Sequence, residues 1–296
     1  MDNKNCDVLV LGAGPAGLTA GLYAARAGMK TIIIESLVAG GSVNLTPDIA
    51  NFPGFLEISG TELGVKMLEQ TEAAGAEIVY DEVTGIDLAK KNITCSEANF
   101  SFKSLIIATG ASPRKLGVGR EEDFIGSGIH FCGLCDGVFY KDKQVIIVGG
   151  GNHAVEEALY MSGIAKKVTI VNNIDRLTAQ QTLIDQLDPK IKIYLNCTVT
   201  KIQGDTKITG IELSNGTAIN ADGIFVAIGR VPNTGQFKDK LELSRHGYII
   251  TDAKMQTNVP GIFAAGDIVD KNVRQVITAC ADGAIAATYA TEYIKQ

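Results

Sequence analysis

The chain repeats one pattern of hydrophobic and polar positions. Residues 8–35 and residues 145–171 each open with an aliphatic run, pass through a glycine turn into positions with helical spacing, and close with a second aliphatic run. Runs rich in Val and Ile that end at glycines are typical of strands buried in a parallel sheet. The repeat predicts strand, turn, helix and strand twice, which is an α/β fold with two Rossmann-like dinucleotide-binding domains.

The remaining pattern predicts that the second domain is inserted into the first. A helix is expected over 61–74, with Ser59 or Thr61 as its cap, and strands are expected over 79–88, 92–94 and 105–110. Two later strands, over 223–229 and 262–267, precede a helix over 274–292. Proline and glycine near 112–113 and 229–235 indicate where the chain crosses between domains. We expect one domain to comprise residues 1–112 and 245–296, and the inserted domain to comprise residues 113–244.

Composition excludes several classes of function. The 296 residues suffice for two domains, and 27 Lys and Arg against 33 Asp and Glu give a net charge of -6. This balance argues against nucleic acid as a partner. We expect no membrane span, because no apolar run reaches about 18 residues. The N-terminus lacks the pattern of a secretory signal, and six cysteines are too few for a disulfide scaffold, so we expect a reducing cytoplasm.

The first glycine turn predicts a dinucleotide site. Its glycines follow a strand and open a helix, and an acid ends the next strand. Gly12 permits the tight turn, Gly14 lets a pyrophosphate approach the backbone, and Gly17 lets the helix pack closely on the strand. The helix N-terminus supplies N–H groups for the phosphates, and Glu35 can accept hydrogen bonds from a ribose. The residues predicted to bind here are Gly12, Gly14, Pro15, Ala16, Gly17 and Glu35.

A second stretch identifies the dinucleotide as FAD. Residues 257–267 follow the TxxxxxxAxGD pattern that contacts the ribityl chain in flavoproteins with two dinucleotide domains. Together with Ala108-Thr109-Gly110, this stretch predicts that residues 1–112 and 245–296 form an FAD-binding domain and that residues 113–244 form an NAD(P)-like domain.

With these motifs the chain resembles the low-molecular-weight thioredoxin reductases nearly from end to end. The matching segments are Gly40-Gly41, 51–55, 108–114, 132–137, 227–234 and the start of the last helix. The resemblance implies bound FAD, thioredoxin as partner and a homodimer. The further flavin-binding residues that it implies are Gly41, Asn51, Thr109, Gly110, Gly266, Asp267, Arg274 and Gln275.

The single CxxC sequence, Cys132 to Cys135, has three interpretations. A structural zinc site needs four ligands, and the chain offers no second CxxC, although His130 lies nearby. A pair of inert buried thiols is the second interpretation. The favoured one is a redox dithiol, because a CxxC closes a small disulfide ring and lowers a thiol pKa. By resemblance, Cys135 exchanges electrons with the flavin, Cys132 attacks the partner's disulfide, and Asp136 is the general acid and base; alternatively, Asp136 is a buried acid without a catalytic role.

The second glycine turn departs from the family pattern. Family members that use NADPH carry a His-Arg-Arg cluster after the next strand, and its positions here fall on Asn172, Asn173 and Ile174. Arg176 remains beside Asp175. Each lost charged hydrogen bond to a 2′-phosphate costs about 1.5–3 kcal/mol. NADH favours an acid at the strand end, which is absent, and the bulky His153 at the helix start could fill the site. We expect a vestigial nucleotide site.

If the second site is vestigial, the electrons need another source. One branch of the resembled family takes single electrons from ferredoxin, and the drop from a plant-type ferredoxin to thioredoxin is about 130 mV, or roughly 6 kcal/mol for two electrons. The sequence therefore favours a ferredoxin-dependent flavin thioredoxin reductase. The alternatives are an NAD(P)H-dependent disulfide reductase, an oxygen-using dithiol oxidase, and a flavoprotein that acts as a redox sensor or scaffold. Oxidation of small dithiols by oxygen would identify the oxidase.

Overall fold

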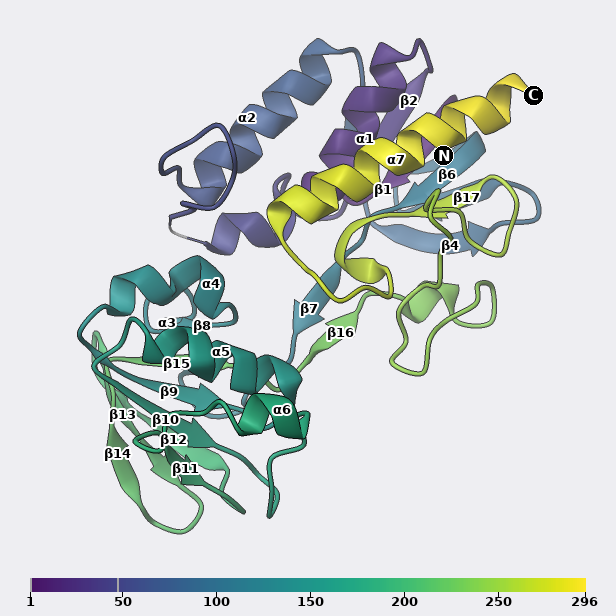
Figure 1. Ribbon diagram of the computed structural model, residues 1–296. Helices are drawn as coiled ribbons and strands as arrows, with labels where there is room; N and C mark the ends of the chain where they lie inside the picture. Colours follow the sequence, from purple (N-terminus) through teal and green to yellow (C-terminus); the bar gives the residue numbers. More distant parts are fainter. Residues whose placement is uncertain (1, 47) are drawn as a thin grey trace. The chain divides into compact units, whose positions relative to one another are not determined.

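The computed structural model describes residues 2–46 and 48–296, which form two compact units (Figure 1). Unit 1 contains the residues up to Asn44, Phe52–Ser112 and Val231–Gln296, and unit 2 contains Leu45–Asn51 and Pro113–Arg230. The return to unit 1 therefore falls at Val231 instead of the expected residue 245. The physical reason is that Phe237 and Leu241 are buried in a core of unit 1.

Unit 1 is built on a seven-stranded sheet in which β17 also pairs with β6. The path β3-β2-β1-β6-β5-β4 has parallel pairing from β3 to β6 and antiparallel pairing from β6 to β4. The strands are β1 (Asp2–Leu11), β2 (Thr31–Glu35), β3 (Glu77–Tyr80), β4 (Val83–Asp87), β5 (Asn92–Cys95), β6 (Ala98–Ile107) and β17 (Ile262–Ala264).

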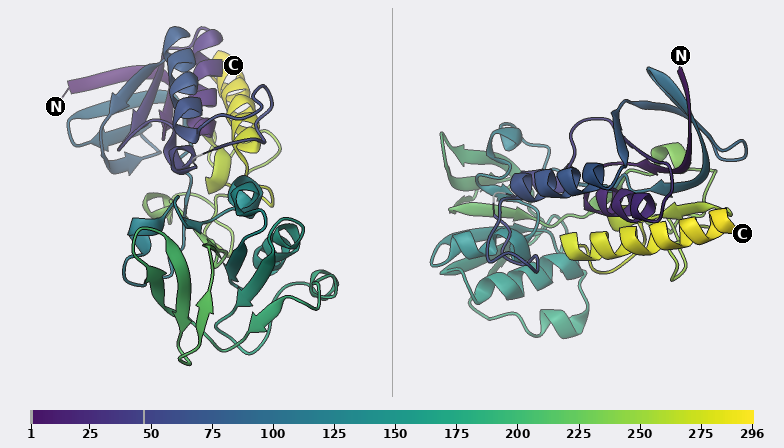
Figure 2. Two further views of the ribbon diagram at one scale, coloured as in Figure 1. Left: turned by 90° about the vertical axis from the view of Figure 1, so that its left-hand side faces the viewer. Right: turned by 90° about the horizontal axis from the view of Figure 1, so that it is seen from above.

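The two faces of this sheet are buried by different partners. Helices α1 (Pro15–Arg26), α2 (Gly60–Ala73) and α7 (Val276–Lys295) lie side by side over one face, as both views of Figure 2 show. Val8 and Val10 of β1 point into this layer, whereas Leu9 and Leu11 point into a second core that includes Phe237 of the 3-10 helix η3 (Gly235–Phe237). The alternation of β1 thus buries every second side chain on each face.

Unit 2 repeats this plan on a smaller scale. Its parallel sheet has the order β11-β10-β9-β15-β8, and a three-stranded antiparallel sheet has the order β12-β13-β14. The strands are β8 (Ile129–His130), β9 (Gln144–Val148), β10 (Lys167–Val171), β11 (Lys192–Tyr194), β12 (Val199–Gly204), β13 (Ile208–Leu213), β14 (Ala218–Asn220) and β15 (Gly223–Val226). The helices are α3 (Glu121–Phe124), α4 (Gly133–Asp136), α5 (Asn152–Ser162) and α6 (Gln181–Ile184). The predicted α/β class with two Rossmann-like sheets is confirmed.

Several predicted boundaries are met and one is wrong. Helix α2 begins after Ser59, whose hydroxyl accepts the Glu62 N–H at 3.1 Å, so Ser59 is the cap. The single strand expected over 79–88 is divided into β3 and β4, because the Asp81 carboxylate accepts N–H groups of the residues that follow β3 and β5 and turns the chain. Strand β7 (Ala111–Pro113) pairs with β16 (Arg230–Pro232) where the chain crosses between units. Within the described residues, no helix is long and apolar enough to span a membrane.

Candidate functional site

The first glycine turn has the close approaches that the sequence predicted. Gly12 has φ +97°, and a Cβ there would lie 2.6 Å from the Ala108 carbonyl oxygen. A Cβ on Gly17 would lie 1.8 Å from the Gly12 carbonyl oxygen, so strand and helix meet with no room for a side chain. Gly14, the N-cap of α1, has nothing within 4 Å of its Cβ position, and Pro15 follows at the first helical position. The helix N-terminus is therefore open to a ligand.

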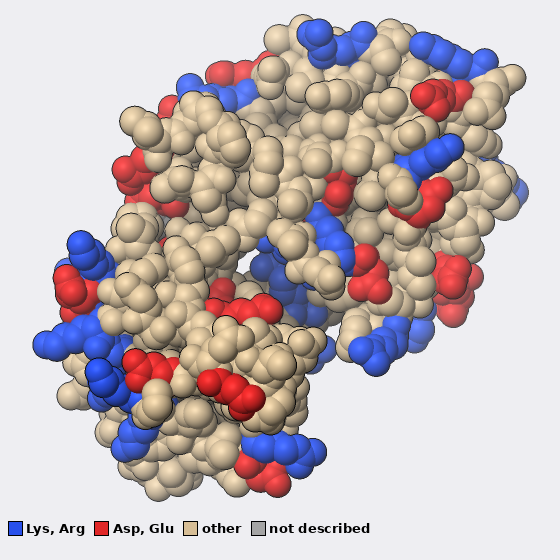
Figure 3. Space-filling model, viewed as in Figure 1, with Lys and Arg blue, Asp and Glu red and all other residues tan. Residues whose placement is uncertain are grey.

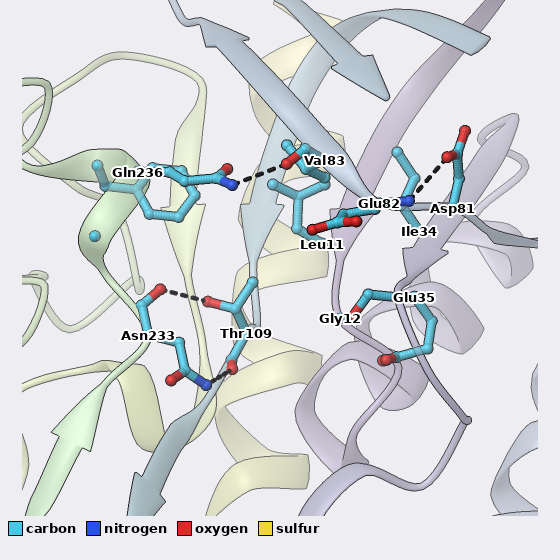
Figure 4. Close-up of a pocket in the computed structure, with 13 residues that line it drawn as sticks. Leu11, Gly12, Ile34, Glu35, Asp81, Glu82, Val83, Thr109, Asn233 and Gln236 are labelled. Carbon is cyan, nitrogen blue, oxygen red and sulfur yellow. Dashed lines mark hydrogen bonds between the residues drawn. The ribbon is translucent and has the colours of Figure 1, made fainter. Parts of the chain in front are cut away.

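A cavity of about 480 Å³ opens in unit 1 beside this turn (Figure 4). Glu35 and Gly12 line it, and the Glu35 carboxylate accepts the N–H groups of Ala13 at 2.8 Å and Leu37 at 3.0 Å. The cavity lies at the carboxyl ends of β1 and β2, where nucleotides bind in doubly wound sheets. Lining residues that the sequence did not indicate are Ser36, Asp81, Glu82, Val83, Asn233 and Gln236.

The other predicted flavin-binding residues divide into four groups, the last of which is the segment before α7. Thr109 and Gly110 are hydrogen-bonded to Asn233. The Asn233 side-chain amide donates to the Thr109 carbonyl oxygen at 2.7 Å, and the Asn233 backbone N–H donates to the Gly110 carbonyl oxygen at 3.0 Å (Figure 4 shows the Thr109 contacts). The second group, Gly41 and Gly266, lies at the start of α1. A Cβ on Gly41 would lie 3.1 Å from Gly14 Cα, and a Cβ on Gly266 would lie 2.8 Å from Ala16 Cβ. Asn51 belongs to a segment of unit 2, and the role of all these residues in flavin binding stays a prediction.

The segment before α7 is held by contacts of its own. Arg274 lies 4.3 Å over the Tyr248 ring and donates to backbone carbonyl oxygens of 269 and 271, while Gln275 caps α7 through a capping box with Thr278. Asp282, which the sequence analysis did not single out, accepts the Gly266 N–H at 3.0 Å and the Lys271 ammonium at 2.6 Å. These contacts hold Gly266 and residues 269–275 of the segment before α7.

The residues of unit 1 fit a bound FAD. The open N-cap of α1, the cavity next to Glu35, and the glycines that leave no space for side chains are features that a dinucleotide needs. The residues whose positions fit the dinucleotide are Gly12, Gly14, Gly17, Glu35 and Gly41.

In unit 2, Cys132 and Cys135 form a disulfide at the start of α4, with Cα atoms 5.3 Å apart. Both cysteines are half-buried, and the Cys135 N–H donates to Cys132 Sγ at 3.2 Å. The described residues contain no cluster of three or more His, Cys, Asp and Glu side chains suited to a metal. Cys6, Cys95 and Cys197 are buried in the cores.

Two buried acidic side chains adjoin the turn that carries this disulfide. Asp136 closes α4, its Oδ2 lies 3.3 Å from His130 Nδ1, and its Oδ1 is buried without a hydrogen-bond partner. Glu157 of α5 accepts the Gly133 N–H at 2.6 Å. Burial raises the pKa of Glu157 from 4.5 to about 7, against the lowering effect of that hydrogen bond. From its place on the helix after the second glycine turn, Glu157 is expected to be an exposed or interdomain charge, and this expectation is wrong, because it is 6% exposed.

The second glycine turn is covered by side chains and backbone of the chain itself. The buried Asn172 lies against Gly150, where a Cβ would come within 2.5 Å of its amide, and it donates to the Arg176 carbonyl at 2.7 Å. The N–H groups of Thr178 and Ala179 donate to the Gly150 carbonyl. The His153 ring is exposed and lies 3.7 Å from Glu157.

Comparison with known proteins identifies the family. The profile of the pyridine nucleotide-disulphide oxidoreductase family matches residues 6–283. A thioredoxin reductase of Listeria monocytogenes is 42% identical over 305 residues, which cover 100% of this chain and 96% of the relative. The thioredoxin reductase structure from Streptococcus pyogenes has a TM-score of 0.91 and 41% identity, covering 99% of each chain. The chain belongs to the thioredoxin reductase family.

The resemblance found in the sequence motifs is thereby confirmed at the level of the family. The chain is a flavin disulfide oxidoreductase of the thioredoxin reductase type, and Cys132–Cys135 is its redox disulfide. A structure described as the atypical thioredoxin reductase TRi from Desulfovibrio vulgaris is more distant, with 29% identity, a TM-score of 0.54, and coverage of 98% of each chain. These relatives do not specify the ferredoxin-dependent branch.

Proposed function

We propose that this reductase holds FAD in unit 1 and uses it to reduce the Cys132–Cys135 disulfide, and that the dithiol then reduces a thioredoxin disulfide. The observation that carries the proposal is the half-buried disulfide at the start of α4, followed at once by an acid with a free buried oxygen. Bound FAD would supply the electron pair. The thioredoxin partner follows from the names of the relatives, and the homodimer from the resemblance alone.

The dithiol exchange needs only residues of unit 2. The Cys132 thiolate attacks one sulfur of the partner's disulfide, forms a mixed disulfide and releases a thiolate, which takes up a proton. Cys135 then attacks Cys132, closes the ring and releases the second partner thiol. The Cys135 N–H donates to Cys132 Sγ in the disulfide form. Asp136 Oδ1 is the atom that would give and take the protons.

Two observations point to different electron donors. The loop at 172–180 contains a single cation, Arg176, which lies 3.3 Å from the Asp175 carboxylate, whereas Asn173 and Ile174 are exposed and uncharged. The 2′-phosphate of NADPH would lack charged partners there, and this supports ferredoxin as the donor. The family description and the relatives favour a pyridine nucleotide more strongly than ferredoxin. NADH, which carries no 2′-phosphate, is compatible with both observations.

On the face drawn in Figure 3, Lys and Arg are interspersed with Asp and Glu, and other residues cover most of the area. An acidic protein and a small anionic nucleotide therefore meet no dominant charge on that face.

An anaerobic titration of the holoenzyme tests the proposal. We expect reduced ferredoxin to bleach the flavin and to support thioredoxin reduction, whereas micromolar NADPH should not bleach it. Bleaching by NADH alone would replace ferredoxin with NADH, and rapid bleaching by NADPH would overturn the interpretation of the 172–180 loop. Bleaching by a small dithiol, with peroxide formed in air and no thioredoxin reduced, would make the protein an oxidase.

A matched variant makes the NADPH result informative. Asn173→Arg with Ile174→Arg places two cations in the exposed loop, while leaving buried Asn172 in place. If the site is intact apart from its charges, the double variant should bind NADPH about 10-fold or more tightly than the wild type, at about 1.5–3 kcal/mol for each charged hydrogen bond. An unchanged affinity would show that the fold of the turn, and not its charge, excludes the nucleotide.

A further inference from the structure

His130 connects the dithiol turn to a buried phenol. It is the last residue of β8, is 5% exposed, and precedes Cys132 by two positions. Its Nδ1 lies 3.3 Å from Asp136 Oδ2, and its Nε2 lies 2.8 Å from the Tyr140 hydroxyl. All three side chains are more than nine-tenths buried. A line of three polar groups therefore passes from the interior of unit 2 to the acid that follows Cys135.

Aromatic packing fixes the imidazole ring. The ring stacks on Phe225 of β15, with centroids 5.4 Å apart and planes at 29°. It meets the edge of Tyr140 at 5.2 Å, and Tyr140 meets Phe225 at 5.3 Å. Three rings from β8, η2 (Gly137–Tyr140) and β15 thus hold one another, so the two ring nitrogens keep their directions.

The protons on this line can be assigned from its chemistry. An ionised carboxylate can only accept, so the proton on the imidazole belongs on Nδ1, which faces Asp136. Nε2 then accepts the Tyr140 O–H. Burial and the charges of Asp136 and Asp222 raise the pKa of Tyr140 to about 12, so this hydroxyl keeps its proton.

We propose that His130 is a positioning residue for Asp136: its Nδ1–H holds Oδ2, so that the unpartnered Oδ1 is the one atom left to exchange protons with the dithiol. The inference deepens the proposed function and rests on Asp136 being the acid of that function. The buried Oδ1 supports it, because a buried oxygen without a partner destabilises the fold unless a reacting group uses it. Glu157 of α5 faces the same turn, through the Gly133 N–H, and stays unchanged in every variant below.

Two substitutions of His130 separate positioning from packing. His130→Asn keeps an amide N–H near the place of Nδ1, and His130→Leu removes every donor while keeping an apolar side chain. The holoenzyme is reduced with dithiothreitol, freed of it, and mixed with the aromatic disulfide DTNB or with oxidised thioredoxin. We expect His130→Leu to slow exchange about 10–100-fold, which is part of the 10²–10⁴-fold that a general acid contributes. His130→Asn should regain most of this rate.

The pH profile gives a readout that packing alone would not move. Without the Nδ1–H, the charged carboxylate loses a donor, so the acid limb of the His130→Leu exchange profile should shift to higher pH. Tyr140→Phe, which keeps the ring but removes the hydroxyl, should shift the limb in the same direction by less. If His130→Leu fails to fold, Tyr140→Phe still tests the line.

The outcomes distinguish this inference from the function on which it rests. Equal losses in His130→Asn and His130→Leu, or profiles that keep the wild-type acid limb in both His130→Leu and Tyr140→Phe, would overturn the positioning role. If the wild-type protein reduces DTNB but not thioredoxin, the proposed partner is overturned. The rates of the His130 variants with DTNB then support or refute the role of His130 by themselves.

Discussion

Glu157→Gln should stabilise unit 2, and only above acidic pH. Glu157 is buried with its Oε2 2.6 Å from the Gly133 nitrogen, and its pKa is raised from 4.5 to about 7, chiefly by burial. The native state therefore holds this proton more tightly than the unfolded chain. For such a carboxyl group, the stabilising contribution is fully present below about pH 4.5 and is lost as pH rises through about 7.

The magnitude follows from the shift. A rise from 4.5 to about 7 corresponds to about 3 kcal/mol at 1.36 kcal/mol per pKa unit. Glutamine has the shape of the protonated acid and keeps an oxygen for the Gly133 N–H, but it carries no charge. The free energy of unfolding of the variant should therefore exceed that of the wild type by up to about 3 kcal/mol near pH 8, and the difference should vanish near pH 4.5.

Urea unfolding followed by circular dichroism, with the disulfide kept oxidised, measures this difference across the pH range. The matched control is Glu156→Gln on the same helix, because Glu156 is exposed and its neutralisation should change stability little at any pH. A Glu157→Gln difference that stays constant between about pH 5 and pH 8 would refute the reasoning, since buried charge would then not be its source. A variant less stable than the wild type near pH 8 would do the same.

Two further predictions concern the glycine turn and the disulfide. Gly17→Ala places a Cβ 1.8 Å from the Gly12 carbonyl oxygen, so the purified variant should retain little flavin and lose about 2 kcal/mol or more of stability. Flavin absorbance and thermal unfolding measure these two losses, and full flavin content would contradict the prediction. Cys135→Ser leaves Cys132 without a resolving thiol and should trap a mixed disulfide with thioredoxin, which is visible on a non-reducing gel. Cys132→Ser should form no such complex, and a complex trapped by Cys132→Ser instead would reverse the assigned roles.

The sequence was sufficient for the features that depend on local pattern. Aliphatic runs ending in glycine predicted β1, β9 and their following helices, because a parallel sheet buried on both faces demands them. The spacing of Gly12 and Gly17 predicted the contacts that the structure shows, since each of these two glycines is required by a neighbour close in the chain or in the adjoining strand, whereas the space at Gly14 is open. The CxxC spacing predicted the disulfide by the same kind of short-range geometry.

Features that depend on distant partners were not predictable in this way. Asp282 lies in α7, 16 residues after Gly266, and only the fold brings its carboxylate to the Gly266 N–H. Glu157 follows an exposed glutamate on a helix, and nothing local shows that it turns to Gly133. The break at Asp81 was missed because its carboxylate binds backbone N–H groups of 96 and 97, which belong to a separate turn.

The dithiol and its supporting acids lie in other segments of unit 2 than the loop at 172–180, and this separation has an evolutionary consequence. Cys132, Cys135, Asp136, His130 and Glu157 all lie between Pro113 and Arg230, in a unit with its own sheets and cores. Mutations that alter the loop at 172–180 touch none of the five. Selection can therefore change the electron donor of such an enzyme without changing its dithiol chemistry. The choice of donor and the dithiol chemistry can then diverge at different rates in descendants of one ancestor.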